Sequence, residues 1–119
     1  MSASFLFEWR NTDNSAAHFV SFVHIPQTRA AFLQVGWDDG IVVRLGNRVV
    51  FDKSNYPPRG KGILYHDKHQ FEVRVPVKLE KGASRLSVLS LNLRGAWIFA
   101  LRITDEQDLP IDGLQFRLE

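Results

Sequence analysis

Two adjacent carboxylates, Asp38 and Asp39, followed by Gly40, are the residues of this 119-residue chain best suited to chemistry. Two hard oxygen donors at a hairpin tip could hold a calcium ion and present it to sugar hydroxyls. The same Asp-Asp-Gly sequence is also typical of a plain tight turn, in which aspartate bonds its own backbone and tolerates a positive φ. Both interpretations stay open, and the first makes Asp38 and Asp39 candidate metal ligands.

An aromatic side chain and several polar ones lie close to this pair in the sequence. The exposed face of an aromatic ring can stack on the C–H groups of a pyranose, so Trp37 is a candidate sugar contact. Trp97 instead alternates with Phe99 and Leu101, which favours a place in the core. The candidate ligand-binding residues offer an aromatic ring or a side-chain oxygen and are Trp37, Asp38, Asp39, Asn47, Asp52 and Tyr56.

No arrangement of residues indicates catalysis. The sequence contains no cysteine, no G-x-S-x-G, no P-loop and no H-E-x-x-H. His66 and His69 belong to a loop-like segment, and His18 and His24 are about 20 Å apart on an extended strand, too far to share a metal. A glycosidase needs two carboxyl groups at a set separation, and the sequence places no such pair. We therefore predict that the chain is not an enzyme.

Charge and hydropathy exclude two classes of partner. The 15 Lys and Arg residues are nearly balanced by 13 Asp and Glu residues and are spread along the chain, which predicts no nucleic-acid partner. No apolar run approaches the roughly 20 residues that span a bilayer, which predicts no membrane partner. Residues 1–10 lack the basic segment that begins a signal peptide, and the compartment stays open.

The positioning elements are predicted from the apolar alternation. Three short apolar runs fill residues 30–52, separated by turn signals at residues 38–40 and at Gly46 with Asn47. Glycine, asparagine and aspartate supply the positive φ that a tight hairpin turn needs. The pattern predicts a three-strand meander over this region.

The second half of the chain contains the most regular strand pattern. Residues 70–79 alternate strictly, and Pro76 on the outward side predicts an edge strand because proline cannot donate to the ladder. In residues 84–93 the apolar phase shifts between Val88 and Leu89, which predicts a β-bulge. The tail is predicted to end in a short strand near residues 114–118.

Roughly eight short strands, with turn signals between them and no helical period, predict one all-β domain over residues 1–119. We expect an antiparallel β-sandwich that resembles a jelly roll. The predicted core consists of the inward apolar residues Phe19, Val23, Phe32, Val35, Val43, Leu45, Phe71, Val73, Val75, Leu86, Val88, Phe99, Leu101 and Ile103.

Residues 30–110 carry a resemblance to a known group of domains. Residues 36–52 combine an apolar strand, Asp-Asp-Gly, a short strand, a Gly-Asn turn and the strand VVFD; residues 79–82 form an L-x-x-G turn, and the strands RLSVLSLN and GAWIFALRITDEQ follow. This pattern resembles the galactose-binding-like β-sandwich superfamily and is similar to the protective-antigen-type lectin sandwich. In those lectins two adjacent aspartates hold calcium, and Asp38 and Asp39 match that position.

The resemblance implies a non-catalytic carbohydrate-binding-like accessory module of a larger bacterial protein. Its expected partners are a glycan, recognised by loops at one end of the sandwich, and an adjacent catalytic domain; its expected cofactor, if any, is calcium. The alternative is a structural or interaction domain that binds no small molecule and packs on a neighbouring enzyme domain.

Overall fold

The computed structural model describes residues 4–9, 15–37, 40–54, 71, 73–92 and 97–119. Within these ranges the chain is all-β, as predicted, and no helix there is long and apolar enough to cross a bilayer. The strands of the described residues are β1 (Ser4–Trp9), β2 (Ser15–Ile25), β3 (Arg29–Trp37), β4 (Gly40–Leu45), β5 (Arg48–Asp52), β6 (Val73–Leu79), β7 (Gly82–Asn92), β8 (Trp97–Thr104) and β9 (Gln115–Arg117).

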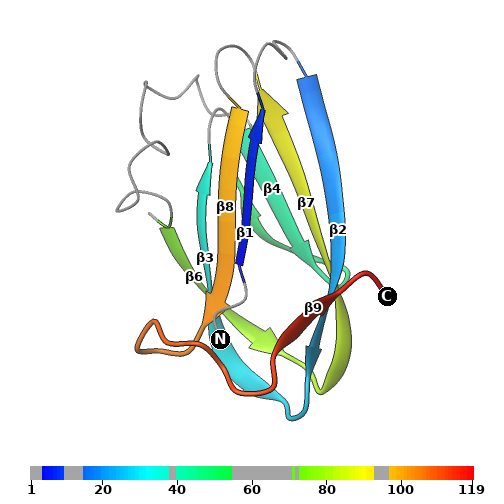
Figure 1. Ribbon diagram of the computed structural model, residues 1–119, viewed down its shortest axis with the longest axis vertical. Helices are drawn as coiled ribbons and strands as arrows, with labels where there is room; N and C mark the ends of the chain where they lie inside the picture. The colour runs from blue at the N-terminus through cyan, green and yellow to red at the C-terminus, as the bar shows by residue number, and fades with distance from the viewer. Residues whose placement is uncertain (1–3, 10–14, 38–39, 55–70, 72, 93–96) are drawn as a thin grey trace.

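Two antiparallel sheets face each other (Figure 1). Sheet A has four strands in the order β1-β8-β3-β6, and sheet B has five in the order β5-β4-β7-β2-β9. The pairs β1–β8, β2–β7, β3–β6 and β4–β5 are nested, as in a long hairpin rolled up on itself. This is the strand arrangement of a jelly roll, with β9 added beside β2, so the predicted fold class is confirmed.

The three-strand meander predicted for residues 30–52 is wrong. β3 pairs with β6 and β8 in sheet A, whereas β4 pairs with β5 and β7 in sheet B, so the chain changes sheets between Trp37 and Gly40. Only the second turn closes a hairpin, and Gly46 adopts the expected positive φ of 63° there. Turn residues mark where strands end, but the choice of neighbour depends on contacts far away in the sequence.

The bulge predicted between Val88 and Leu89 is also wrong. β7 pairs with β2 in unbroken register, and the irregularity of sheet B lies instead between Val43 and Arg44, where β4 pairs with β5. Leu89 faces outward and is 36% exposed. An apolar residue at an outward position shifts the apparent phase of the pattern, as an inserted residue would.

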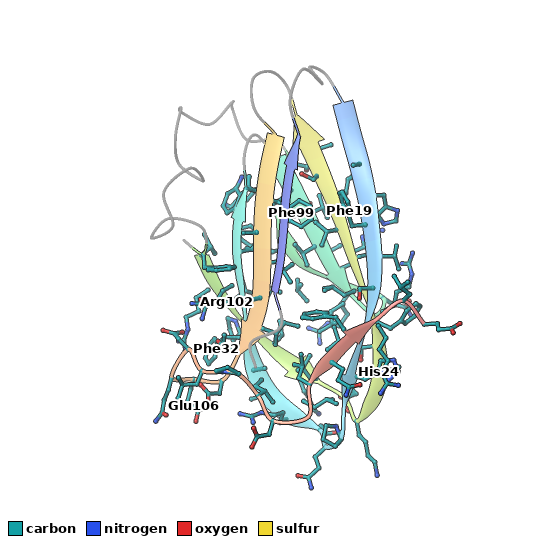
Figure 2. The ribbon with its side chains drawn as sticks, in the orientation of Figure 1. Phe19, His24, Phe32, Phe99, Arg102 and Glu106 are labelled. Atoms are coloured by element: carbon teal, nitrogen blue, oxygen red, sulfur yellow. The ribbon has the colours of Figure 1, made fainter. Side chains whose placement is uncertain are left out.

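The inner faces of the two sheets form the core, and Phe19 and Phe99 meet between them with ring centroids 5.1 Å apart (Figure 2). Most of the predicted core is confirmed, either buried or packed against the buried cluster; these residues are Phe19, Val23, Val35, Val43, Leu45, Val73, Val75, Leu86, Val88, Phe99, Leu101 and Ile103. The burial of alternate side chains on each strand supplies the main driving force for folding.

Two residues that were predicted in the core, Phe32 and Phe71, are not part of it. Both lie under cations: the guanidinium of Arg74 is 3.7 Å from the Phe32 ring centroid, and that of Arg102 is 4.2 Å from the Phe71 ring centroid. Such stacking makes a half-buried ring favourable without a place in the core. Apolar patterning alone does not separate the two environments.

Replacement of Leu101 tests the packed core. Leu101→Ala should lower the free energy of unfolding by about 2–5 kcal/mol, because the side chain is 0% exposed and its removal leaves a cavity. Urea unfolding followed by circular dichroism measures the loss. Leu118→Ala, at a position 90% exposed, is the control and should change stability by less than about 0.5 kcal/mol. Equal losses in both variants would contradict the assigned core.

Candidate functional site

The sequence-predicted site residues do not form one constellation in the described structure. Trp37 ends β3 with only 2% of its surface exposed, and its ring packs edge-on against Phe51 at a centroid distance of 5.2 Å. Its faces are therefore occupied by the core rather than open to a sugar. Asp38, Asp39 and Tyr56 lie outside the described residues, so their predicted roles stay predictions.

Asn47 lies at the other end of sheet B from the Trp37–Gly40 connection. It occupies the β4–β5 turn, and the six residues of β4 span about 20 Å between the two ends. A hollow of about 380 Å³ at this lower end is lined by Gly46 but not by Asn47. Asn47 therefore does not share a site with Asp52, which lies near the upper end of β5.

Asp52 does line a hollow, of about 450 Å³, on the outer face of sheet B. We call it the sheet B hollow and define it by its lining residues, which are His18, Val42, Arg44, Asp52, Ser54, Ser87 and Leu89. Four different strands and Ser54, just after β5, supply this lining, which brings together parts of the chain that are distant in sequence.

Strand register positions these side chains in two cross-strand rows. In the first row Asp52 pairs with Val42, Val42 with Leu89, and Leu89 with His18. The second row, one step down the sheet, consists of Val49, Arg44, Ser87 and Val20. Residues opposite each other on adjacent antiparallel strands share a face, so both rows point away from the core.

Asp52 is the acidic group of the hollow. Its Oδ1 accepts hydrogen bonds from the Ser54 backbone N–H at 2.9 Å and from the Ser54 hydroxyl at 2.7 Å. These two bonds, aided by the charges of Arg44 and Lys53, hold the pKa of Asp52 below the usual 3.8. The carboxylate is therefore ionised at neutral pH and can accept hydrogen bonds from a ligand.

The other strands of the hollow carry two nitrogen-containing side chains, His18 and Arg44. Nε2 of His18 lies 3.1 Å from Oγ of Ser87, which ties β2 to β7 on the outer face. Arg44 is exposed on β4, two residues from Val42, and its guanidinium can only donate hydrogen bonds. Val42 and Leu89 form an apolar floor that separates Asp52 from His18 along the first row.

A second group of polar side chains lies on the outer face of sheet A, and its members form hydrogen bonds with one another. The buried amide of Gln34 donates from Nε2 to Oγ1 of Thr104 at 2.9 Å and to Oδ1 of Asp108 at 2.6 Å, and its oxygen accepts from Nε and Nη2 of Arg102 at 3.0 and 2.7 Å. Arg74 donates to the same Asp108 oxygen at 3.0 Å. Since these groups bond one another, the network holds the loop after β8 against sheet A.

The loop itself is built around Asp105. Its carboxylate accepts hydrogen bonds from the backbone N–H groups of Gln107 and Leu109 at 2.8 and 2.9 Å, and these bonds lower its pKa, the Leu109 bond most. Asp108 has a φ of 64°, a left-handed conformation that aspartate tolerates. Glu106 extends from this loop beside sheet A (Figure 2). We interpret this network as structural.

Sequence reasoning missed most of the hollow. It placed His18 on a strand, but it named neither His18 nor Arg44 as a site residue with Asp52. The one sign of the hollow in the sequence is the apolar residue Leu89 at an outward position, which the apolar pattern alone attributes to a bulge. Only the register of β2, β4 and β7 shows that Leu89 lies between Val42 and His18.

Comparisons with known proteins add no relative. No protein-family model matches the chain, and neither a curated protein nor a solved structure was found to be similar to it. In the described part of the chain no group of three or more His, Cys, Asp and Glu side chains could hold a metal ion. The functional argument therefore depends on the geometry of the described residues.

The bonds from Ser54 to Asp52 can be tested by titration. Ser54→Ala removes the hydroxyl donor but keeps the backbone donor, so the Asp52 pKa should rise towards 3.8 without reaching it. Carboxyl ¹³C shifts measured by NMR report this pKa. The hydroxyl's contribution to stability should be present above the unfolded-state pKa and be lost as the pH falls through the folded-state pKa. Ser84→Ala is the control, and an Asp52 titration unchanged in Ser54→Ala would contradict the assignment.

The network on sheet A predicts a stability loss at Asp108. Asp108→Ala removes the acceptor shared by Gln34 and Arg74 and should cost about 1–3 kcal/mol in thermal or urea unfolding. Asp108→Asn keeps an acceptor and tolerates the positive φ, so it should cost less than half as much. Asp112→Ala, on the exposed surface, should be nearly neutral. Equal effects of the two Asp108 variants would contradict the network.

Proposed function

We propose that this chain is a non-catalytic module that binds a carbohydrate on the outer face of sheet B. The observation that carries the proposal is the sheet B hollow, where a carboxylate acceptor, Asp52, and a guanidinium donor, Arg44, border an apolar floor. Sugars present hydroxyl groups that both donate and accept hydrogen bonds, together with apolar C–H faces. A site with a few placed polar groups on an apolar surface matches that chemistry.

The dimensions of the hollow favour an oligosaccharide over a single enclosed sugar. Asp52 on β5 and His18 on β2 are separated by three strand spacings, or about 14 Å. The hollow is open to solvent along this width. An extended chain of sugar units could therefore contact both ends of the first cross-strand row.

The proposal moves the ligand from the loops at one end of the sandwich to the sheet face. Recognition by end loops, with Asp38 and Asp39 holding calcium, stays a prediction because those residues lie outside the described ranges. Asp52 itself pairs with Val42, close to the start of β4. Attachment to a catalytic domain is part of the proposal as the setting in which such a module acts.

One observation favours the alternative, an interaction domain that docks on a neighbouring protein. Val20, Val49 and Leu89 are 38%, 50% and 36% exposed on this same face, and exposed aliphatic side chains are common at protein interfaces. The polar pair Asp52 and Arg44 favours the sugar. An interaction domain would bind no glycan of any class.

The test is a glycan panel of neutral and acidic oligosaccharides, run with calcium and with chelator. The wild-type chain should bind at least one class, and Asp52→Ala and Arg44→Ala should each weaken that binding about tenfold or more, because each loses a hydrogen bond to a charged group. Asp112→Ala and Arg48→Ala are the matched controls outside the hollow. Binding abolished by chelation would assign a role to calcium.

Two results would contradict the proposal. One is the absence of binding to every glycan in both conditions, which would favour the interaction domain. The other is glycan binding that neither Asp52→Ala nor Arg44→Ala weakens, which would place the ligand elsewhere on the chain.

A further inference from the structure

We infer that the glycan is acidic and that its carboxylate pairs with Arg44. This inference rests on the proposed function, since it names the ligand class of the same hollow. It is carried by the charge of the sheet face, by the availability of one guanidinium, and by the arrangement of the groups around it.

The outer face of sheet B is basic. Strand register places Arg44, Arg85, Arg117 and Asp52 on this face in the described residues, and the acidic residue Glu119 lies beside it, its backbone oxygen 3.1 Å from Nε2 of His24. Next to the hollow, the two arginines of adjacent rows, Arg44 and Arg85, outnumber the one acid, Asp52. A face of one sign raises the local concentration of ligands of the opposite sign.

Arg44 is the guanidinium of the hollow that is available to a ligand, and the Arg85 side chain on the next row is likewise without a hydrogen bond or ion pair among the described residues. Within the described part of the chain Arg44 makes no ion pair and no side-chain hydrogen bond, whereas Arg74 and Arg102 are engaged by Asp108 and Gln34 on sheet A. Arg117 is partly engaged by Gln115. A planar guanidinium fork matches a planar carboxylate through two parallel hydrogen bonds, which a neutral hydroxyl cannot reproduce.

The neighbours of Arg44 offer further contacts to the same sugar. Its cross-strand neighbours are Val49 on β5 and Ser87 on β7, and Val20 lies beyond Ser87. Val49 and Val20 add exposed apolar surface to this row, against which the C–H groups of a sugar ring can pack. Ser87, close to His18, can add a hydrogen bond from the same row.

Asp52 and Arg44 act on each other through their charges, which helps to lower the pKa of Asp52, but they do not form a close pair. No ion pair joins Asp52 to Arg44 among the described residues, and Oδ1 of Asp52 is occupied by both Ser54 donors. Asp52 lies one register step up the sheet, about 7 Å along the strand from the level of Arg44. At that distance it can accept a hydroxyl of the ring while the acid group of the sugar lies on Arg44.

The basic face continues past the hollow, one row further along the strands from Arg44 and away from Asp52. On the next row down, Phe22 pairs with Arg85 on one side and with Arg117 on the other. A half-buried aromatic ring between two cations could stack on a further sugar unit and bind its carboxylate. A polymer with an acid group on every unit would use this row and the Arg44 row together, so affinity should rise with chain length.

The experiment compares acidic oligosaccharides with their own methyl esters. Hexamers of galacturonate, mannuronate and the glucuronate-containing hyaluronan repeat are each titrated into the chain by calorimetry, beside the fully esterified form and a neutral hexamer. At least one acidic hexamer should bind about tenfold or more tightly than its ester. Added salt should lower the affinity for the acidic hexamer and leave the affinity for the ester unchanged.

Variants assign the preference to Arg44. Arg44→Gln should abolish the difference between acid and ester, and Arg44→Lys should retain part of it, since lysine keeps the charge without the fork. Arg48→Gln, on the adjacent strand and outside the hollow, is the matched control and should bind as wild type. Thermal melts confirm that each variant is folded.

The outcomes separate this inference from the function on which it rests. Equal binding of acid and ester, or binding of neutral hexamers alone, would overturn the inference and leave carbohydrate binding intact. An acid preference that survives in Arg44→Gln would overturn the role of Arg44. If no oligosaccharide of any class binds, the proposed function itself fails.

Discussion

The pairing of β2 with β7 is the constraint on which the rest of the structure depends. It joins two strands of eleven residues each in unbroken antiparallel register, from Ser15 opposite Asn92 to Ile25 opposite Gly82. β4 adds to one side of this ladder and β9 to the other. A slip of one residue would exchange the inner and outer faces of β2, placing His18 in the core and Phe19 in water, so burial of the apolar set determines the register.

The same ladder creates the candidate site without any dedicated loop. Leu89 and Ser87 on β7 face outward between strands that carry His18 and Val20 on one side and Val42 and Arg44 on the other. The hollow is therefore a consequence of side-chain alternation on a curved jelly-roll sheet. The sheet A face shows the contrast, because there the polar groups bond one another through Gln34 and Asp108.

The sequence was sufficient for the strands and for most of the core, because alternate burial leaves a period of two that needs no knowledge of partners. Val43, Leu86 and Leu101 were identified in this way. It was insufficient wherever a residue's environment depends on a distant strand. Phe32 lies on the opposite face of β3 from the buried Leu33 and Val35, and distant strands supply the cations, Arg74 and Arg102, that cover the Phe32 and Phe71 rings.

The candidate site shows the same limit. Asp52 could be named from the sequence because it ends a strand near a turn, but its partners lie on β2, β4 and β7 and become neighbours only through register. Trp37 was a reasonable sugar contact by position, yet the chain changes sheets after it and its ring packs against Phe51.

Interstrand nuclear Overhauser effects between β2 and β7 test the central claim most directly. The account predicts backbone contacts that pair His18 with Leu89 and Val20 with Ser87, together with slow amide exchange through the middle of the ladder. Contacts that instead pair His18 with Val88 or Ser90 would show a register shifted by one residue. That result would turn Leu89 towards the core, remove the floor of the sheet B hollow and contradict the account.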